Sequence, residues 1–141
     1  MPRAAGGVVA RIRVVAAALR DPADRQRVLI AQRPAGKWRA GAWEFPGGKI
    51  EDGESVATAL ARELDEELGV RVEEAIELGH FMHDYGDRSV EIVFWLVTAF
   101  SGTPAGRDGQ ALRWVHWSEL DRVDLLEADL PMLPSLREVL E

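Results

Sequence analysis

The sequence predicts an α+β fold in which a mixed β-sheet is packed between helices. Two segments, 11–19 and 89–100, are rich in apolar and β-branched residues, as strands buried on both faces are. Residues 56–68, which lie between them in the chain, have the spacing of an amphipathic helix, and 129–140 can form a second helix. With 141 residues, the chain is expected to form one domain, 1–141, with its own core.

Turn residues divide the sheet-forming sequence into strands. The segments that we expect to be strands are 11–19, 28–32, 43–45, 75–82, 89–100 and 112–117. Turn residues at 21–24 separate the first strand from the second, and turn residues at 86–87 separate the fourth strand from the fifth. Loops at 34–42 and 101–110 carry glycine and polar residues, and residues 1–10 are expected to be a loose start.

Local signals define both ends of the helix at 56–68. Ser55 is a good N-cap, and Gly69 is a good residue for the position just after the helix. At about 100° per residue, one apolar stripe runs along the helix and consists of Val56, Leu60, Leu64 and Leu68. This stripe predicts the face that packs on the sheet.

Three glutamates lie close to this stripe. Glu63 and Glu67 fall one turn apart beside it, and Glu66 lies just beyond them. An acidic face turned to solvent would be the ordinary interpretation, but Glu63 and Glu67 border the buried stripe. Carboxylates crowded at the margin of a core repel one another and raise each other's pKa unless a cation offsets them. The pattern therefore predicts a site for divalent metal.

Glycines bracket these carboxylates at a fixed spacing. The run 48–70 fits the pattern G-x5-E-x7-R-E-U-x-E-E-x-G-U, in which U is an aliphatic residue. With each residue type used at roughly 7%, a chance match at a given start is below about one in a hundred million. The run resembles the signature of the Nudix hydrolases. The resemblance implies an α/β/α sandwich and hydrolysis of a nucleoside triphosphate to the monophosphate and pyrophosphate.

The resemblance also implies roles within this run. Glu63, Glu66 and Glu67 would hold Mg²⁺ or Mn²⁺, because hard carboxylate oxygens favour these ions over zinc. Glu54 and Arg62 would keep the loop and the helix in register, with Arg62 pairing with Glu66 one turn further on.

Beyond the signature, runs such as 43–51 resemble the MutT subgroup of the family. Gly47, just before the signature, would offer its carbonyl to the metal. Asp108 stands where MutT proteins place a late carboxylate ligand, although it also suits a plain turn and is shorter than glutamate. The attacking water could be deprotonated by Asp108 or by either of the last two glutamates of the helix, and the sequence leaves this open.

Other residues match MutT positions that bind the nucleotide. Arg33 and Arg88 would contact it, with surface salt bridges as the alternative. Phe45 could line the base pocket or belong to the core. Trp38 lies in a polar loop, where we expect it to pack on the sheet, the alternative being that it caps the substrate.

One departure concerns the base. The MutT-like asparagine that reads a purine would fall near Pro134, which cannot make that contact. The segment 129–134 is closer to relatives that act on cytidine triphosphates and oxidised pyrimidines. Asp129 is then the candidate to reach the base, with helix N-capping as its alternative. 8-oxo-dGTP is the favoured substrate, in a nucleotide-pool sanitation role linked to DNA repair, and (d)CTP or an oxidised-pyrimidine triphosphate is the alternative.

Two further interpretations come from the same resemblance. Tyr85 lies near the distance from the signature at which dinucleoside polyphosphate hydrolases carry a tyrosine. A non-catalytic Nudix binding module should have lost carboxylates of the signature, and this chain has all of them.

Charge and composition limit the partners. A net charge of −7 argues against a surface for nucleic-acid polymers but not against a small phosphorylated ligand, because bound metal supplies positive charge. No run approaches the roughly 20 apolar residues of a membrane span. The sequence contains no cysteine, which excludes disulfides. We expect a cytoplasmic enzyme, a monomer or a homodimer.

Overall fold

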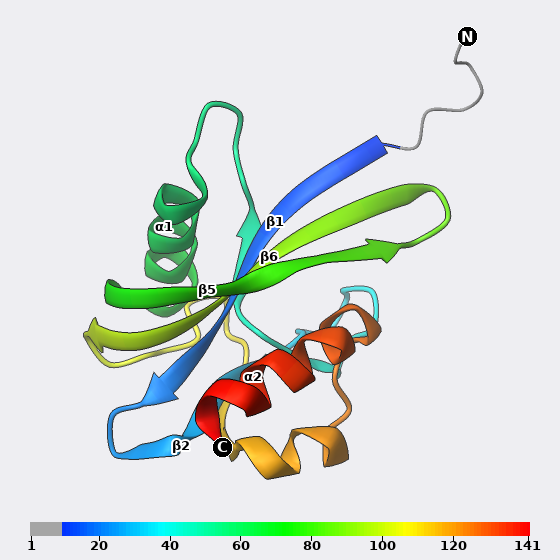
Figure 1. Ribbon diagram of the computed structural model, residues 1–141. Helices are drawn as coiled ribbons and strands as arrows, with labels where there is room; N and C mark the ends of the chain where they lie inside the picture. The colour runs from blue at the N-terminus through cyan, green and yellow to red at the C-terminus, as the bar shows by residue number, and fades with distance from the viewer. Residues whose placement is uncertain (1–9) are drawn as a thin grey trace, which may run out of the picture.

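The computed structural model describes residues 10–141 of the chain (Figure 1). Its strands and helices, in chain order, are β1 (Ala10–Asp21), β2 (Asp24–Gln32), β3 (Trp43–Glu44), β4 (Gly47–Lys49), α1 (Val56–Leu68), β5 (Arg71–Asp84), β6 (Arg88–Ser101), β7 (Leu112–His116), the 3₁₀ helices η1 (Trp117–Arg122) and η2 (Glu127–Met132), and α2 (Leu133–Leu140).

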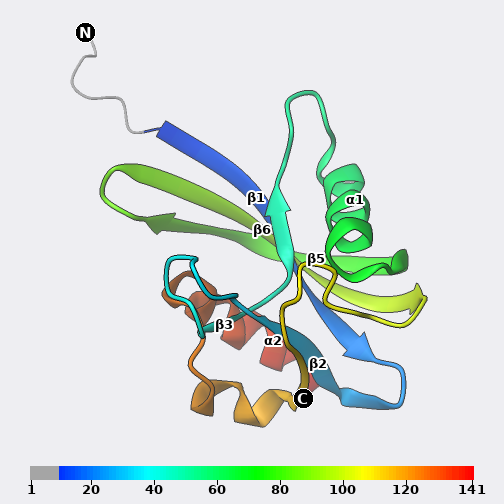
Figure 2. The ribbon, with the colours of Figure 1, turned by 180° about the vertical axis from the view of Figure 1, so that it is seen from behind.

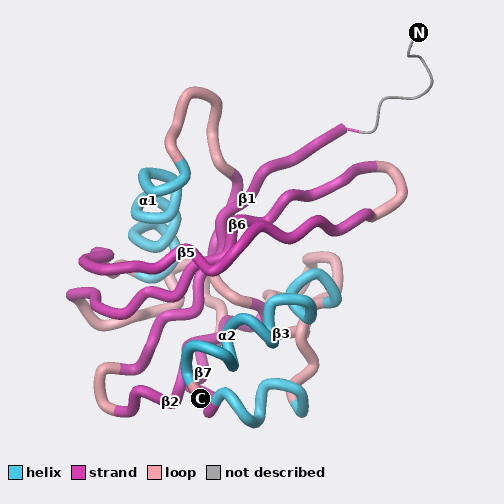
Figure 3. Tube along the Cα trace, in the orientation of Figure 1, coloured by secondary structure: helices cyan, strands magenta, loops and turns pink. Residues whose placement is uncertain are grey.

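The seven strands form one mixed sheet (Figure 3). Along its main path the order is β3-β2-β1-β6-β5, with β4 paired to β1 and β7 paired to β2. Val15 of β1 lies opposite Val93 of the parallel strand β6 and opposite Gly48 of the antiparallel strand β4. The strand β1 therefore brings the glycine pair of β4 to the centre of the sheet.

Helices cover both faces of this sheet (Figures 1 and 2). Val15 and Ala17 of β1 pack in one core with Leu60 and Leu64 of α1. Their neighbours in β1, such as Ala16, belong to a second core, which contains residues of α2. Successive side chains of a strand point to opposite faces. The middle of β1 is covered on both faces, and its residues 15–19 are accordingly all apolar. The predicted α+β sandwich is confirmed.

Helix α1 has the predicted ends. The Ser55 hydroxyl accepts the backbone N–H of Thr58 at 3.1 Å, and Gly69 is left-handed with φ 72°. The residues buried along the helix are Ala59, Leu60, Leu64 and Leu68, so the predicted stripe is present except that Val56 is only partly buried and Ala59 joins it. Because this stripe faces the sheet, the glutamates beside it are held at the edge of a rigid core.

The structure differs from the predicted boundaries in several places. Strand β1 ends at Asp21 and β2 begins at Asp24, so both extend into the predicted turn between them. Strands β5 and β6 extend beyond 75–82 and 89–100, because they pair along a long hairpin whose ends carry polar residues. The short strand β4 was not predicted, since two glycines give no strand signal. The C-terminal segment divides into η2 and α2, with Pro131 inside η2, in place of one helix from 129. The loose start expected at residues 1–10 falls, except for Ala10, outside the described residues.

Among residues 10–141, no helix has the length and apolar character needed to cross a bilayer.

Candidate active site

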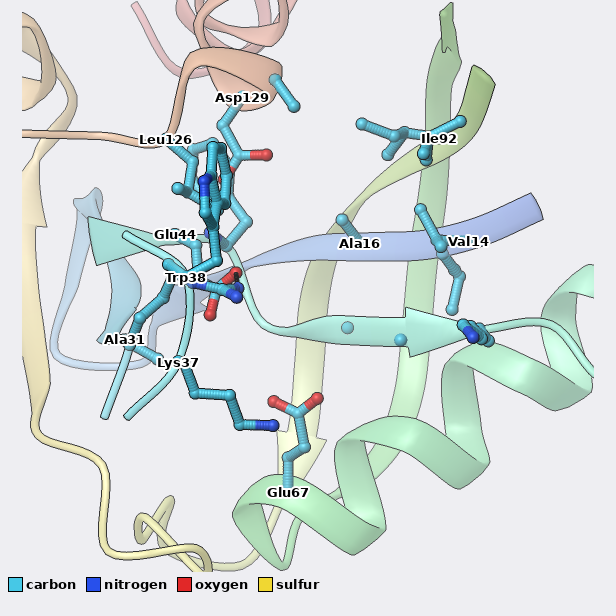
Figure 4. A pocket seen from close by; sticks show the side chains of 18 of the residues that line it. Val14, Ala16, Ala31, Lys37, Trp38, Glu44, Glu67, Ile92, Leu126 and Asp129 are labelled. Atoms are coloured by element: carbon cyan, nitrogen blue, oxygen red, sulfur yellow. Dashed lines mark hydrogen bonds and ion pairs between the residues drawn. The ribbon is translucent and has the colours of Figure 1, made fainter. Parts of the chain in front are cut away.

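A cavity of about 720 Å³ opens beside β4, between the C-terminal part of α1 and the segment that contains η2 (Figure 4). Glu67 lies at one end of it and Asp129 at the other. Of the residues predicted from the sequence, those that line this cavity are Arg33, Phe45, Gly47, Glu67, Arg88, Asp108 and Asp129. Those that do not line it are Glu54, Arg62, Glu63 and Glu66.

Arg62 binds the carboxylates that lie outside the cavity. Its guanidinium donates to Glu54 through Nε at 2.7 Å and Nη2 at 2.8 Å, to Glu63 at 2.9 Å and to Glu66 at 3.3 Å. A further bond of 3.0 Å reaches the Lys49 carbonyl. The expected pairing of Arg62 with Glu66 is therefore present, and Arg62 ties α1 to the preceding loop.

The ion pair with Arg62 also controls the charge of Glu54. The guanidinium hydrogen bond, helped by the backbone N–H of Glu51, lowers the pKa of Glu54 to about 2. Glu54 is therefore an ionised partner of Arg62 across the whole physiological range.

The glycines of β4 allow its backbone to lie close to strand β1 on one side and to the Glu63 side chain on the other. A Cβ on Gly47 would collide with the Val15 carbonyl of β1, and a Cβ on Gly48 would collide with the Glu63 carboxylate. A side chain at either position would push β4 away from β1 or Glu63 away from the loop. This is the physical reason for the two adjacent glycines.

Glu67 is the half-buried carboxylate of the site. Burial, followed by the charges of Glu63 and Glu44, raises the pKa of Glu67 to about 8, with a smaller contribution from Asp108 in the same direction. The Gly47 backbone partly opposes this shift. Within the described residues Glu67 has no basic partner, so its negative charge is not offset by a side chain.

The loop that carries Asp108 is docked on the end of α1. The backbone N–H groups of Ala105 and Arg107 donate to the carbonyls of Leu68 and Glu67, both at 3.0 Å, and the Arg107 side chain donates to the Asp65 carbonyl at 3.1 Å. The Leu68 and Glu67 carbonyls belong to the last turn, where carbonyls lack a partner inside the helix, whereas the Asp65 carbonyl also accepts the Gly69 N–H at 2.9 Å. The docking places Asp108 at the same end of the cavity as Glu67.

Gln110 adds to this docking. Its side chain accepts the Asp108 N–H at 2.8 Å and donates to the Glu67 carbonyl at 3.4 Å. Sequence reasoning did not single out Gln110, although its place two residues after Asp108 was a usable signal.

The carboxylates are not arranged as a ready-made metal cage. Within residues 10–141, no group of three or more His, Cys, Asp or Glu side chains is placed to hold one ion. The reason is that Glu63 and Glu66 face Arg62, and Glu66 is 59% exposed. The donor set nevertheless fits a hard divalent cation, because Glu67 and Asp108 add carboxylate oxygens to a crowded acidic end that a cation would relieve.

Asp129 lies at the opposite end of the cavity and is only 6% exposed. Its carboxylate accepts the backbone N–H of Phe45 at 3.0 Å. Burial raises the pKa of Asp129 to about 7; the Phe45 N–H and Arg33 oppose the shift, and Glu44 adds to it. Its alternative role as an N-cap is not observed, because it binds the backbone of a different element.

The remaining predicted residues surround Asp129. Arg33 forms an ion pair with Glu44 at 3.1 Å and donates to the Trp38 carbonyl at 2.7 Å. The Phe45 ring is buried against Phe94, with 5.0 Å between ring centroids, so its side chain belongs to the core while it borders the cavity.

Sequence reasoning also missed Glu44 and Lys37 and misplaced Trp38, all of which line the cavity. Glu44 is a charged residue between two aromatic residues of a predicted strand, and this pattern could have indicated a functional side chain. The sequence around Lys37 gives no comparable indication. Trp38 is 59% exposed at the cavity and does not pack on the sheet as expected. Pro134 does not line the cavity.

Comparison with known proteins identifies the family of this chain. The family model described as NUDIX domain matches residues 10–139. The CTP pyrophosphohydrolase of Escherichia coli is 39% identical over 107 residues, which are 76% of this chain and 79% of that protein. The 8-oxo-dGTP diphosphatase of E. coli is 33% identical over 116 residues, or 82% of this chain and 90% of that protein. The solution structure of the E. coli ORF135 protein superposes with a TM-score of 0.82 at 35% identity, covering 95% of each chain.

Proposed function

The chain belongs to the NUDIX hydrolase family, and from that premise we propose that it hydrolyses a nucleoside triphosphate to the monophosphate and pyrophosphate. The observation that carries this proposal is one cavity with Glu67 and Asp108 at one end and the buried Asp129 at the other. The acidic end suits a metal-bound phosphate chain, and the other end offers a polar group to a base.

NUDIX hydrolases need a divalent metal, and we propose Mg²⁺ or Mn²⁺ for this chain. Glu67 and Asp108 would hold it, with Glu63, Glu66 and the Gly47 carbonyl completing the set. When bound, the ion would offset the charge of the phosphate oxygens and assist the attack of water on phosphorus.

The protein's own residues would position the reacting groups. Glu67, whose pKa is raised by burial and by the neighbouring carboxylates, is the proposed general base. Arg62 holds Glu54 and Glu63 against the loop, so that α1 and β4 keep a fixed distance. Arg33 and Arg88 supply positive charge along the cavity.

The base would be read by Asp129. As a carboxylate it can accept the N1–H and the 2-amino group of guanine, which supports 8-oxo-dGTP as the substrate. A second candidate is a cytidine triphosphate. The pKa of Asp129, near 7, favours this candidate, because a protonated carboxyl can donate to N3 of cytosine and accept from its 4-amino group. With 8-oxo-dGTP as the substrate, the reaction would remove an oxidised nucleotide from the pool, and we propose that the enzyme works in the cytoplasm, where that pool is.

The test is hydrolysis of a panel of substrates, followed as release of the nucleoside monophosphate, which all of them can yield; pyrophosphate is the expected second product of the triphosphates. The panel contains normal and oxidised nucleoside triphosphates, diadenosine polyphosphate and ADP-ribose, ranked by kcat/KM. We expect a nucleoside triphosphate to rank first and turnover to stop in excess chelator. Higher kcat/KM for diadenosine polyphosphate or ADP-ribose would contradict the proposal, as would undiminished turnover with chelator.

A further inference from the structure

The loop that joins β2 to β3 lines one side of the cavity and is closed at its base. The backbone N–H of Arg33 donates to the Ala42 carbonyl at 2.8 Å, and the N–H of Gly41 donates back to the Arg33 carbonyl at 3.0 Å. The Arg33 side chain donates a further hydrogen bond to the Trp38 carbonyl. Residues 34–41, here called the covering loop, are therefore presented as a unit beside the cavity.

Arg39 holds the tip of the covering loop in an unusual conformation. With φ 58°, it is the one non-glycine residue with positive φ among residues 10–141. Its guanidinium forms ion pairs with Asp124 at 3.0 Å and Glu127 at 2.9 Å. A left-handed backbone is unfavourable for arginine, so these two contacts offset a local strain. Both partners belong to the segment that leads to Asp129.

This conformation places an aromatic ring at the cavity. Trp38 lines the cavity while 59% of it remains exposed. Its ring meets Tyr85 edge to face, with 5.8 Å between centroids. Tyr85 comes from the turn between β5 and β6 and is itself covered by the Arg88 guanidinium at 5.0 Å. Two aromatic side chains from distant segments thus meet beside the same cavity.

Lys37, the residue before Trp38, supplies a cation on the same side. It lines the cavity and extends toward the end at which Glu67 lies (Figure 4). Within the described residues it stands in no ion pair, whereas Arg33 is paired with Glu44. Its ammonium is therefore available to a ligand, and an anionic chain between Asp129 and Glu67 would lie within its field.

Resting on the proposed function, we propose that the covering loop recognises both parts of the nucleotide. Trp38, together with Tyr85, stacks against the base, and Lys37 binds the triphosphate chain. Arg39 does not touch the substrate: it is a positioning residue that fixes the loop through Asp124 and Glu127. An exposed tryptophan has no packing reason to occupy this position, whereas base–aromatic stacking gives it one.

The experiment separates the base from the phosphates. For Trp38→Ala we expect KM for the preferred nucleoside triphosphate to rise about tenfold or more, while competitive inhibition by inorganic tripolyphosphate is unchanged. Trp38→Phe should restore most of the affinity. For Lys37→Gln, the KM for nucleotide and the inhibition constant of tripolyphosphate should rise together.

Arg39 is tested by two substitutions. Arg39→Ala and Arg39→Gly both remove the ion pairs, but glycine tolerates the positive φ, so the second variant loses the contacts without the strain. Both should raise KM for nucleotide with little change in kcat. Arg137→Ala, which removes an equally charged residue on α2, should leave KM unchanged.

Failure of the loop proposal and failure of the proposed function give different results. If wild type hydrolyses a nucleoside triphosphate but Trp38→Ala and Lys37→Gln keep KM within twofold, the loop proposal is wrong and the function stands. If wild type hydrolyses none, the function fails. Calorimetric titration of the same variants with nucleotide and with tripolyphosphate then decides the loop proposal, because it needs no turnover.

Discussion

The two ends of the cavity are built in different ways. The acidic end comes mostly from one continuous stretch, 47–67, in which Arg62 binds residues before and after it. The other end, around Asp129, is the proposed site of the nucleotide base and is here called the base end; it is assembled from separate segments around 33–44, 85–88 and 124–129. A contiguous stretch fixes its own geometry, whereas the other end depends on how distant elements meet. Substitutions at the acidic end should therefore remove chemistry, and those at the base end should change what is bound.

The largest expected effect is at the acidic end. Glu67→Gln keeps the size of the side chain but removes its ability to take a proton or bind a cation strongly. We expect kcat to fall by about 10²–10⁴, with the far-ultraviolet circular dichroism spectrum unchanged. Activity within tenfold of wild type, measured at saturating substrate, would show that Glu67 is not the base.

At the base end the expected effect is on selectivity and on pH dependence. Asp129→Asn keeps an oxygen to accept the Phe45 N–H but cannot be charged. We expect the ranking of purine and pyrimidine triphosphates by kcat/KM to change, with kcat for the better substrate reduced much less than in Glu67→Gln. An unchanged ranking across the panel would show that Asp129 does not contact the nucleotide base.

The same substitution tests the buried charge. The pKa of Asp129, about 7 in the folded chain, lies above its ordinary value near 3.8. Between these values the folded state binds more protons than the unfolded state, so stability falls as the pH rises through about 4 to 7. The contribution is at most about 4 kcal/mol. Asp129→Asn should flatten the dependence of the unfolding free energy on pH in this window, and an unaltered slope would contradict the raised pKa.

The difference between the two ends also explains what the sequence could predict. The ends of α1, the stripe beside Glu67 and the pairing of Arg62 with Glu66 depend on residues close in the chain, and all were predicted and observed. The contact of Asp129 with Phe45 joins residues 84 positions apart, and no local pattern announces it. The prediction that Trp38 packs on the sheet was wrong for the same reason. The surroundings of Trp38 depend on Tyr85, which lies in the distant turn between β5 and β6.

Asp108 combines features of the two ends, because it lies at the acidic end but is carried there by a distant loop. A substitution of Arg107 tests how firmly this loop is held against α1. The Arg107 side chain donates to the Asp65 carbonyl and lies against Gly69, where a Cβ would meet its guanidinium. Arg107→Ala removes this bond and a cation at the end of α1, and should cost about 1 kcal/mol of stability. That loss corresponds to a fall in Tm of about 3 °C.

The effect of Arg107→Ala on kcat should be smaller than that of Asp108→Ala, because the two backbone bonds of Ala105 and Arg107 to the helix remain. The double variant with Asp108→Ala gives the sharper test. If Arg107 acts by holding Asp108 in place, its effect on kcat should vanish once Asp108 is gone, while its effect on Tm persists. Additive effects on kcat would mean that Arg107 acts on the reaction by a route other than Asp108. If Arg107→Ala alone left kcat unchanged, the loop would be held at the acidic end by its two backbone bonds to the helix without the Arg107 side chain.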